Sequence, residues 1–414
     1  MTPLFSRWLA GSWLLAVVLI LGGGPTLEAR AAVAIRVLLT AEANQVEIQT
    51  DGAIRVLTAD GRERQLPSPL VVTVGNAGVL LSGVSASSDR VSIQGGRSGL
   101  VIGLLQTAAT GGKAPTGGTA GVGTLTKWTV SGGLRIIQHG RQLMVVNEVD
   151  LEEYTKGVVP GEVSAGWHPE VLKAQAVAAR TYVLYQRTLS AGRDYDVVSG
   201  VQDQVYQGRQ GVDERILRAV EETRGLAVGF QGRPIYAAFS STAAGPTEDA
   251  LNVWSKDLPY LRGVDCPFDV KSPYYRWRVA VPIDKLERAL RQQGVGVGNV
   301  ATVTPFGYSR AGRVIRIRIL HSGGELLLRG EDLRKIVGYS ILPSARFEVE
   351  SVGSDVVFTG FGAGHGVGLC QWGAKEMAEL GYSFGTILSY YYPGTDITRV
   401  DQLDLSPQNP SSSS

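Results

Sequence analysis

Hydrophobic and polar residues alternate along residues 34–102, and this period of two predicts strands. The alternation is visible in AIRVLL, QVEIQT and RVSIQG, and the pairs Asp51-Gly52 and Asp60-Gly61 separate such runs. Successive side chains of a strand point to opposite faces, and Asp-Gly pairs favour tight hairpin turns. We therefore expect a small antiparallel β module at residues 32–106.

The apolar spacing changes to a helical one between residues 171 and 189. The repeating positions are Val171, Ala174, Val177, Ala178, Thr181 and Leu184, three or four apart as on one helix face. Pro169 suits a first helical turn, and Glu170 favours the positive end of the helix dipole. The small apolar face permits close packing against another element.

The remaining pattern predicts an α+β protein with a β-rich N-terminal module followed by a mixed α/β domain. Residues 107–124 are rich in Gly and Thr and are typical of a linker or long loop. The mixed domain is expected at residues 125–400, with helices at 283–293 and 330–337 and strands at 226–240, 275–281 and 314–321. Residues 401–414 form a polar tail that is expected to be disordered.

Residues 1–31 are typical of an export signal. Arg7 precedes an uncharged stretch at residues 8–21, and Ala29-Arg30-Ala31 fits a small-residue cleavage site. The stretch is shorter than the roughly 20 residues of a membrane-spanning helix, although an uncleaved anchor extending to Leu27 is the alternative. We expect an exported protein of the periplasm or cell envelope, in an oxidising compartment.

Charge argues against nucleic acid as a partner. The chain has 40 basic and 38 acidic residues, without a long basic run. A nucleic-acid-binding protein usually carries a basic patch or stripe.

Glu162 is the first candidate for chemistry. It lies in the segment VVPGEVSAGW, in what we expect to be a turn before the helix, with apolar sequence neighbours. Apolar surroundings raise the pKa of a carboxyl group, and such a group can act as a general acid on a glycosidic bond. The alternative is a carboxylate that accepts hydrogen bonds from backbone N–H groups before the helix.

Lys173 and Arg180 follow on the predicted helix, seven positions apart. This separation is close to two helical turns, so both side chains project from one face. They are candidates for contacting a substrate near Glu162, and the alternative is a solvated basic stripe.

A second candidate region is the glycine-rich segment at residues 358–374. Its glycines fall at every second position, so an extended backbone would have one face without side chains. A sugar ring could approach that face, bordered by His365 and Trp372. The alternative is a bulge or tight packing against the helix predicted at residues 171–189.

These segments resemble the SpoIID/LytB family of peptidoglycan-acting proteins. The matching blocks are Leu151, Tyr154, Gly157 to Val159, Glu162, Trp167, Leu172 to Tyr182, Gln204 to Gly208, Thr223 to Gly225, Phe239 to Ser241, Val253-Trp254, Gly364 to Gly368 and Tyr391 to Thr395. Several ordered blocks are a more specific signal than any single motif.

The resemblance implies a lytic transglycosylase that cuts peptide-stripped glycan strands between N-acetylmuramic acid and N-acetylglucosamine. It makes Glu162 the catalytic residue, with the substrate's own C6 hydroxyl as nucleophile and a 1,6-anhydro product. The residues expected to bind substrate are Lys173, Arg180, Tyr182, Ser240, Ser241, Trp254, His365, Gln371 and Trp372. No cofactor is expected, and a cell-wall amidase is a possible partner. Some members are noncatalytic amidase enhancers, which is the alternative function.

Two departures from the family pattern limit which residue roles can be assigned from the resemblance. Ala243 and Ala244 stand where a pair of glycines is more usual, which puts backbone contacts there in doubt. Some members carry a zinc-associated His/Cys cluster after the catalytic helix, but residues 196–208 contain neither residue type. No metal site is therefore carried over.

The chain has two cysteines, Cys266 and Cys370, and export favours a disulfide between them. Two alternatives are a zinc site that includes His365 and a pair of free thiols. A further hypothesis makes the protein a Cys/His enzyme, with Cys370 as nucleophile and His365 as base.

Overall fold

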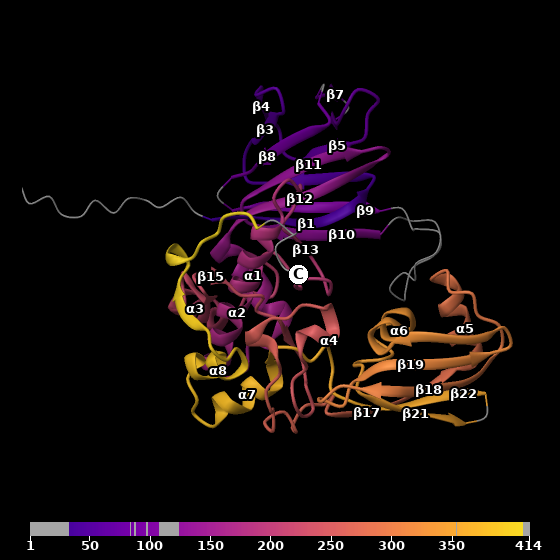
Figure 1. Cartoon of the computed structure of the whole chain (residues 1–414). Coiled ribbons are helices and arrows are strands. Elements are labelled where there is room, and N and C mark those ends of the chain that lie inside the picture. The colour runs from indigo at the N-terminus through magenta and orange to yellow at the C-terminus, as the bar shows by residue number, and fades with distance from the viewer. Residues whose placement is uncertain are drawn as a thin grey trace, which may run out of the picture. The chain divides into compact units, whose positions relative to one another are not determined.

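The computed structural model describes residues 33–82, 84–86, 88–96, 98–106, 124–352 and 354–408 (Figure 1). The predicted export signal, nearly all of the predicted linker and the last six residues lie outside this range. Helices and several separate sheets make up the described chain, so the predicted α+β class is confirmed. Within the described residues, no helix is both long enough and apolar enough to cross a membrane.

Two antiparallel sheets contain the alternating segments. The first has the order β13-β1-β12-β11-β8-β3-β4 and the second β10-β9-β2-β5-β6-β7. Their strands are β1 (Ala34–Ala43), β2 (Gln45–Gln49), β3 (Ile54–Thr58), β4 (Glu63–Leu66), β5 (Leu70–Thr73), β6 (Leu80–Leu81), β7 (Val84–Ser85), β8 (Arg90–Gln94), β9 (Leu100–Gln106), β10 (Thr124–Val130), β11 (Gly133–His139), β12 (Gln142–Asp150) and β13 (Val197–Val198). Among the described strands of these two sheets, only β13 adds in parallel.

Strands on both sides of the predicted linker share these two sheets. β1 pairs with β12, where Ala34 lies opposite Asp150, and β9 pairs with β10. The sheets therefore include residues 124–150, which the pattern had assigned to the second domain. Long-range pairing decides which strands share a sheet, and the order of segments along the chain does not reveal that pairing.

Helix α1 (Leu151–Glu162) follows β12 directly, and α2 (Pro169–Leu189) comes next. Helix α3 (Glu214–Glu222) follows after β13. The carboxylate of Asp150 accepts a hydrogen bond from the N–H of Glu152 and caps α1. The segment that ends in Glu162 was expected to be a turn, but it is the last turn of α1, which contains Pro160.

The small apolar face of α2 packs as expected. Val171, Ala174 and Ala178 belong to a buried cluster that includes Leu369 and Leu388. The other elements of this region are β14 (Leu226–Phe230), β15 (Arg233–Pro234), β16 (Phe239–Ser240), α4 (Ala250–Trp254), η1 (Pro259–Leu261), β23 (Leu369–Cys370), α7 (Gln371–Glu379), α8 (Phe384–Tyr391) and β24 (Asp396–Arg399). The core thus joins α2 to segments nearly 200 residues away in sequence.

Residues 276–361, orange in Figure 1, have a core of their own around Leu286, Ile317, Leu333 and Phe358. The elements are β17 (Arg276–Pro282), α5 (Ile283–Gln292), β18 (Val300–Tyr308), β19 (Val314–His321), β20 (Gly324–Arg329), α6 (Gly330–Val337), β21 (Phe347–Val352) and β22 (Asp355–Phe361). Both helices predicted here are present.

The predicted disorder of the tail is wrong for residues 401–408. The helix η2 (Val400–Gln402) leads to Asp404, which forms an ion pair with Arg233. The N–H of Gln408 donates to the carbonyl of Thr188 at 2.8 Å. Specific polar contacts therefore order a segment whose composition is polar.

Candidate active site

Glu162 is the final residue of α1 and meets a loop from farther along the chain. The N–H of Val205 donates to its Oε1 at 2.8 Å. A Cβ atom added at Gly161 would lie 2.4 Å from the carbonyl oxygen of Val205. Glycine at this position therefore lets the loop come close enough to hold the carboxyl group.

The environment of Glu162 favours its protonated form. Burial raises its pKa above the ordinary value of 4.5, and hydrogen bonds from Val205 and Gln371 only partly oppose this shift. Desolvation disfavours the charged form of a carboxyl group. The sequence-based expectation of a raised pKa thus has a structural cause.

The first residues of α7 lie beside Glu162. The side-chain amide of Gln371 is 3.4 Å from the backbone oxygen of Glu162. The N–H of Trp372 donates to the carbonyl of Ser241 at 3.1 Å. Of the residues predicted to bind substrate, Gln371 therefore contacts Glu162, while Trp372 and Ser241 lie next to Gln371.

Two tryptophans make an aromatic pair at this place. Trp167 and Trp372 have ring centroids 5.3 Å apart at an interplanar angle of 65°, and the ammonium group of Lys375 lies over both rings. Both tryptophans are only partly buried. Such a pair offers apolar ring surface against which a sugar can pack.

Gln175 is a residue of this site that sequence reasoning missed. Its Oε1 lies 3.4 Å from the amide nitrogen of Gln371. Its own Nε2 is buried and has no hydrogen-bond partner within the described residues. Its place inside the family-like block at residues 172–182 was the signal available.

Lys173 is occupied by two carboxylates. Its ammonium group lies 2.9 Å from Glu170 and 2.7 Å from Glu222. The side chain is partly exposed, so a substrate could still reach it. The structure shows no contact between Lys173 and Glu162.

Arg180 has a structural role in this protein. Its side chain is 0% exposed and forms a salt bridge of 2.8 Å with Glu152. It also donates to the carbonyl of Leu226 at 2.9 Å. The prediction that Arg180 binds substrate is not supported, because its guanidinium has no accessible surface.

Tyr182 and Ser240 are also buried. The hydroxyl of Tyr182 donates to Asp203 at 2.8 Å, and the hydroxyl of Ser240 accepts from the N–H of Gly366 at 3.1 Å. Their hydrogen-bonding groups are used within the protein, so these two substrate-binding predictions lack structural support.

The glycine-rich segment is not the extended ribbon that its spacing suggested. Gly362, Gly364, Gly366 and Gly368 all have positive φ, between 71° and 93°. A Cβ atom at Gly364 would lie 2.6 Å from Ser240, and one at Gly366 would lie 2.1 Å from Arg313. Protein atoms occupy the space that the pattern had offered to a sugar, but they belong to Ser240 and Arg313 rather than to the predicted helix, which is α2.

His365 and Trp254 lie together, with ring centroids 4.8 Å apart. Nδ1 of His365 accepts from the N–H of Val367. Burial and the charges of Arg334 and Arg313 lower the pKa of His365 to about 3, so its ring is neutral at ordinary pH.

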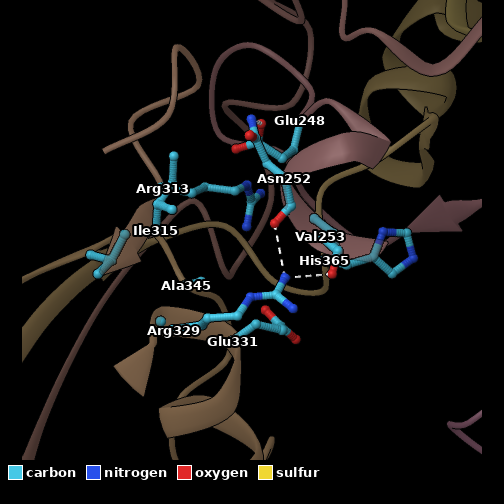
Figure 2. A pocket seen from close by; sticks show the side chains of 11 residues that line it. Glu248, Asn252, Val253, Arg313, Ile315, Arg329, Glu331, Ala345 and His365 are labelled. Atoms are coloured by element: carbon cyan, nitrogen blue, oxygen red, sulfur yellow. Dashed lines mark hydrogen bonds between the residues drawn. The ribbon is translucent and has the colours of Figure 1, made fainter. Parts of the chain in front are cut away.

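Figure 2 shows a pocket that His365 borders. Arg329 reaches across it to the carbonyls of Asn252 and Val253, at 2.9 and 2.6 Å. Arg313 and Glu248 are further lining residues. Glu162 is not among them, so this pocket is not the place of the candidate acid.

Cys266 and Cys370 are both buried and free in this structure, so the predicted disulfide is not formed. Their sulfur atoms and a carboxylate oxygen of Asp269 all lie within 4.8 Å of one another. Burial raises the pKa of Cys370, and its sulfur contacts Asp269 at 3.2 Å. His365 is neutral and weakly basic, and the contacts described for its ring are with Val367 and Trp254 rather than with Cys370. The Cys/His nucleophile hypothesis therefore has no support.

Comparisons with known proteins agree with the motifs. The family described as "Stage II sporulation protein" matches residues 139–230. A domain of unknown function matches residues 253–368, which includes the part with its own core.

Three curated relatives extend the similarity. An uncharacterised protein of Brachyspira hyodysenteriae is 34% identical over 277 residues, which are 66% of this chain and 73% of that protein. The stage II sporulation protein D of Bacillus amyloliquefaciens is 36% identical over 274 residues, 62% of this chain and 76% of that protein. The amidase enhancer of Bacillus subtilis is 29% identical over 291 residues, 59% and 40% of the two chains. With these motifs, this site and these relatives, the chain belongs to the SpoIID/LytB family.

Proposed function

We propose that this protein cleaves peptidoglycan glycan strands as a lytic transglycosylase, with Glu162 as its catalytic acid and base. Membership of the family supports a role at the cell wall. The observation that carries the proposal is a carboxyl group whose pKa burial raises, beside a partly exposed pair of tryptophans. We further propose that the protein is exported, because its substrate lies outside the cytoplasm.

A single carboxyl group is enough for this reaction. Glu162 first gives its proton to the oxygen of the breaking glycosidic bond, between N-acetylmuramic acid and N-acetylglucosamine. As a carboxylate it then accepts the proton of the C6 hydroxyl, whose oxygen bonds to C1 of the same sugar. The acid is restored, and the product is a 1,6-anhydro end.

The other carboxyl groups we considered have different partners. Hydrolysis would require a second carboxyl group across the bond, and Glu153 and Glu248 are the first candidates. Glu153 pairs with Lys156, and Glu248 accepts from the N–H of Asp249 and from Asn252. The contacts described for them do not involve Glu162.

The product distinguishes the two mechanisms. With peptide-stripped glycan in ¹⁸O-labelled water, we expect 1,6-anhydro ends that carry no label, measured by mass spectrometry. Label at the new sugar end would show hydrolysis and contradict the single-acid mechanism.

The raised pKa of Glu162 also predicts how folding stability depends on pH. The folded state holds this proton more tightly than the unfolded chain. The wild type should therefore lose stability relative to Glu162→Gln as pH rises from the ordinary pKa of 4.5 through the raised pKa of the folded state. Urea unfolding of both proteins over this range measures the difference. A difference that stays constant, or that changes in the opposite direction, would show that the pKa is not raised.

A second candidate function is a noncatalytic enhancer of a cell-wall amidase. The relative named amidase enhancer favours it. In that case glycan binding would depend on Trp167 and Trp372, and the protein would stimulate the amidase. Substitution of Glu162 would change neither glycan binding nor amidase stimulation.

A further inference from the structure

Three buried side chains with metal-ligating atoms meet where α7 begins. The ligand atoms of Cys266, Asp269 and Cys370 lie within 4.8 Å of one another, and each residue is at most 2% exposed. Thiolates favour Zn²⁺ over Ca²⁺ or Mg²⁺. Three protein ligands with a fourth position left for another donor are a known zinc arrangement.

One atom of this cluster is buried without a partner. Oδ2 of Asp269 accepts from the N–H of Ala244 at 2.7 Å and contacts the thiol of Cys370. Its Oδ1 has no hydrogen-bond partner within the described residues. A buried polar atom in this state is costly, and a cation between the carboxylate and the sulfurs would satisfy it.

A disulfide would not explain Asp269. Forming the S–S bond would remove both thiol hydrogens, including the one directed at Oδ2 of Asp269. The carboxylate of Asp269 would still accept from the N–H of Ala244, but it would have no new hydrogen-bond donor. A bound cation accounts for all three side chains, whereas a disulfide accounts only for the two cysteines.

The surroundings also fit negatively charged ligands. The N–H of Ala243 donates to the sulfur of Cys370 at 3.4 Å, and Cys370 is the N-cap residue of α7, at the positive end of the helix dipole. The hydroxyl of Tyr391 lies 3.2 Å from the sulfur of Cys266. This hydroxyl or a water molecule is available for the fourth position.

We propose that Cys266, Asp269 and Cys370 form a zinc site that fastens the loop at residues 266–269 to the start of α7. On binding, both thiols release their protons to solvent and the sulfurs coordinate the ion. Gln371 and Trp372 follow Cys370 directly, so the ion would hold them in place beside Glu162. The inference does not rest on glycan cleavage.

Metal content and thiol titration test the site in the wild-type protein. The full-length chain, purified without a metal-affinity step, should contain about one zinc ion per chain. Its thiols should react only after denaturation with a chelator. Two reactive thiols without metal would overturn the proposal, and so would a metal-free protein whose thiols appear only after reduction.

Variants test the ligands themselves. Asp269→Asn should weaken zinc binding by more than about tenfold, measured by competition with a chromogenic chelator. Asp265→Asn, which changes an exposed aspartate directly before this loop, should bind zinc like the wild type. Cobalt substitution should give sulfur-to-cobalt charge-transfer absorption that Cys370→Ser weakens.

Equal zinc affinity in Asp269→Asn and Asp265→Asn would contradict the assignment of Asp269. If Cys370→Ser does not fold, the wild-type metal content and the Asp269→Asn affinity still decide the proposal. Each of these measurements reports metal binding rather than turnover. A result that overturns the zinc site would therefore leave the proposed enzymatic function untouched.

Discussion

Glu162→Gln is expected to lower the rate of glycan cleavage by about 10²- to 10⁴-fold, the usual cost of losing a general acid. The amide cannot deliver a proton, but it has the size of the carboxyl group and can still accept from the N–H of Val205. Glycan binding and folding should therefore persist. Anhydro ends released per unit time, together with a glycan pull-down assay, measure both effects.

The matched control is Glu153→Gln on the same helix. Burial acts to raise the pKa of Glu153, but hydrogen bonds from Lys156 and Ser131 bring it below its ordinary value, so this group is a poor acid at neutral pH. The Glu153→Gln protein should therefore cleave glycan at the wild-type rate. Wild-type turnover in Glu162→Gln would show that Glu162 is not the catalytic acid. Amidase stimulation without glycan cleavage, in both the wild type and Glu162→Gln, would favour the enhancer function.

Arg180→Met is expected to destabilise the fold by about 3–5 kcal/mol, because it leaves the nearly buried carboxylate of Glu152 without its ion-pair partner. The carbonyl of Leu226 also loses its donor. The double variant Arg180→Met/Glu152→Met should be more stable than Arg180→Met, since it removes the uncompensated charge. Chemical denaturation gives the free energies of unfolding.

Arg224→Met provides the comparison. Arg224 pairs with Glu221 on the surface, with side chains 50% and 58% exposed, and such pairs contribute about 0–1 kcal/mol. If Arg180→Met is as stable as Arg224→Met but cleaves glycan poorly, Arg180 serves the reaction and the structural interpretation is incorrect.

Residue types and local spacing were sufficient for several elements. Alternation predicted the strands between β1 and β9, and small residues at helical spacing predicted α2. Both are properties of single segments, because the hydrophobic period of a strand or helix depends on its own geometry. Glu162 was recognised as the candidate acid for a similar reason, since its motif is contiguous.

Tertiary structure decided what depends on contacts between distant segments. The sequence placed Lys173 and Arg180 on one helix face, but only the fold shows that Glu152 and the carbonyl of Leu226 enclose Arg180. It likewise brings Gln371, more than 200 positions away, to Glu162. Alternate glycines suggested an open face, whereas their positive φ values and the arginine packed on Gly366 close it.

The sequence by itself therefore determined the family, the α+β class, the main helix and the candidate acid, all of which rest on local patterns. Only the tertiary structure determined which polar groups are accessible and which are paired inside the protein. It also brought Asp269 to the two cysteines, a meeting that their separation in sequence does not predict. The physical reason is that burial and pairing depend on which segments pack together, and one segment's pattern does not contain that information.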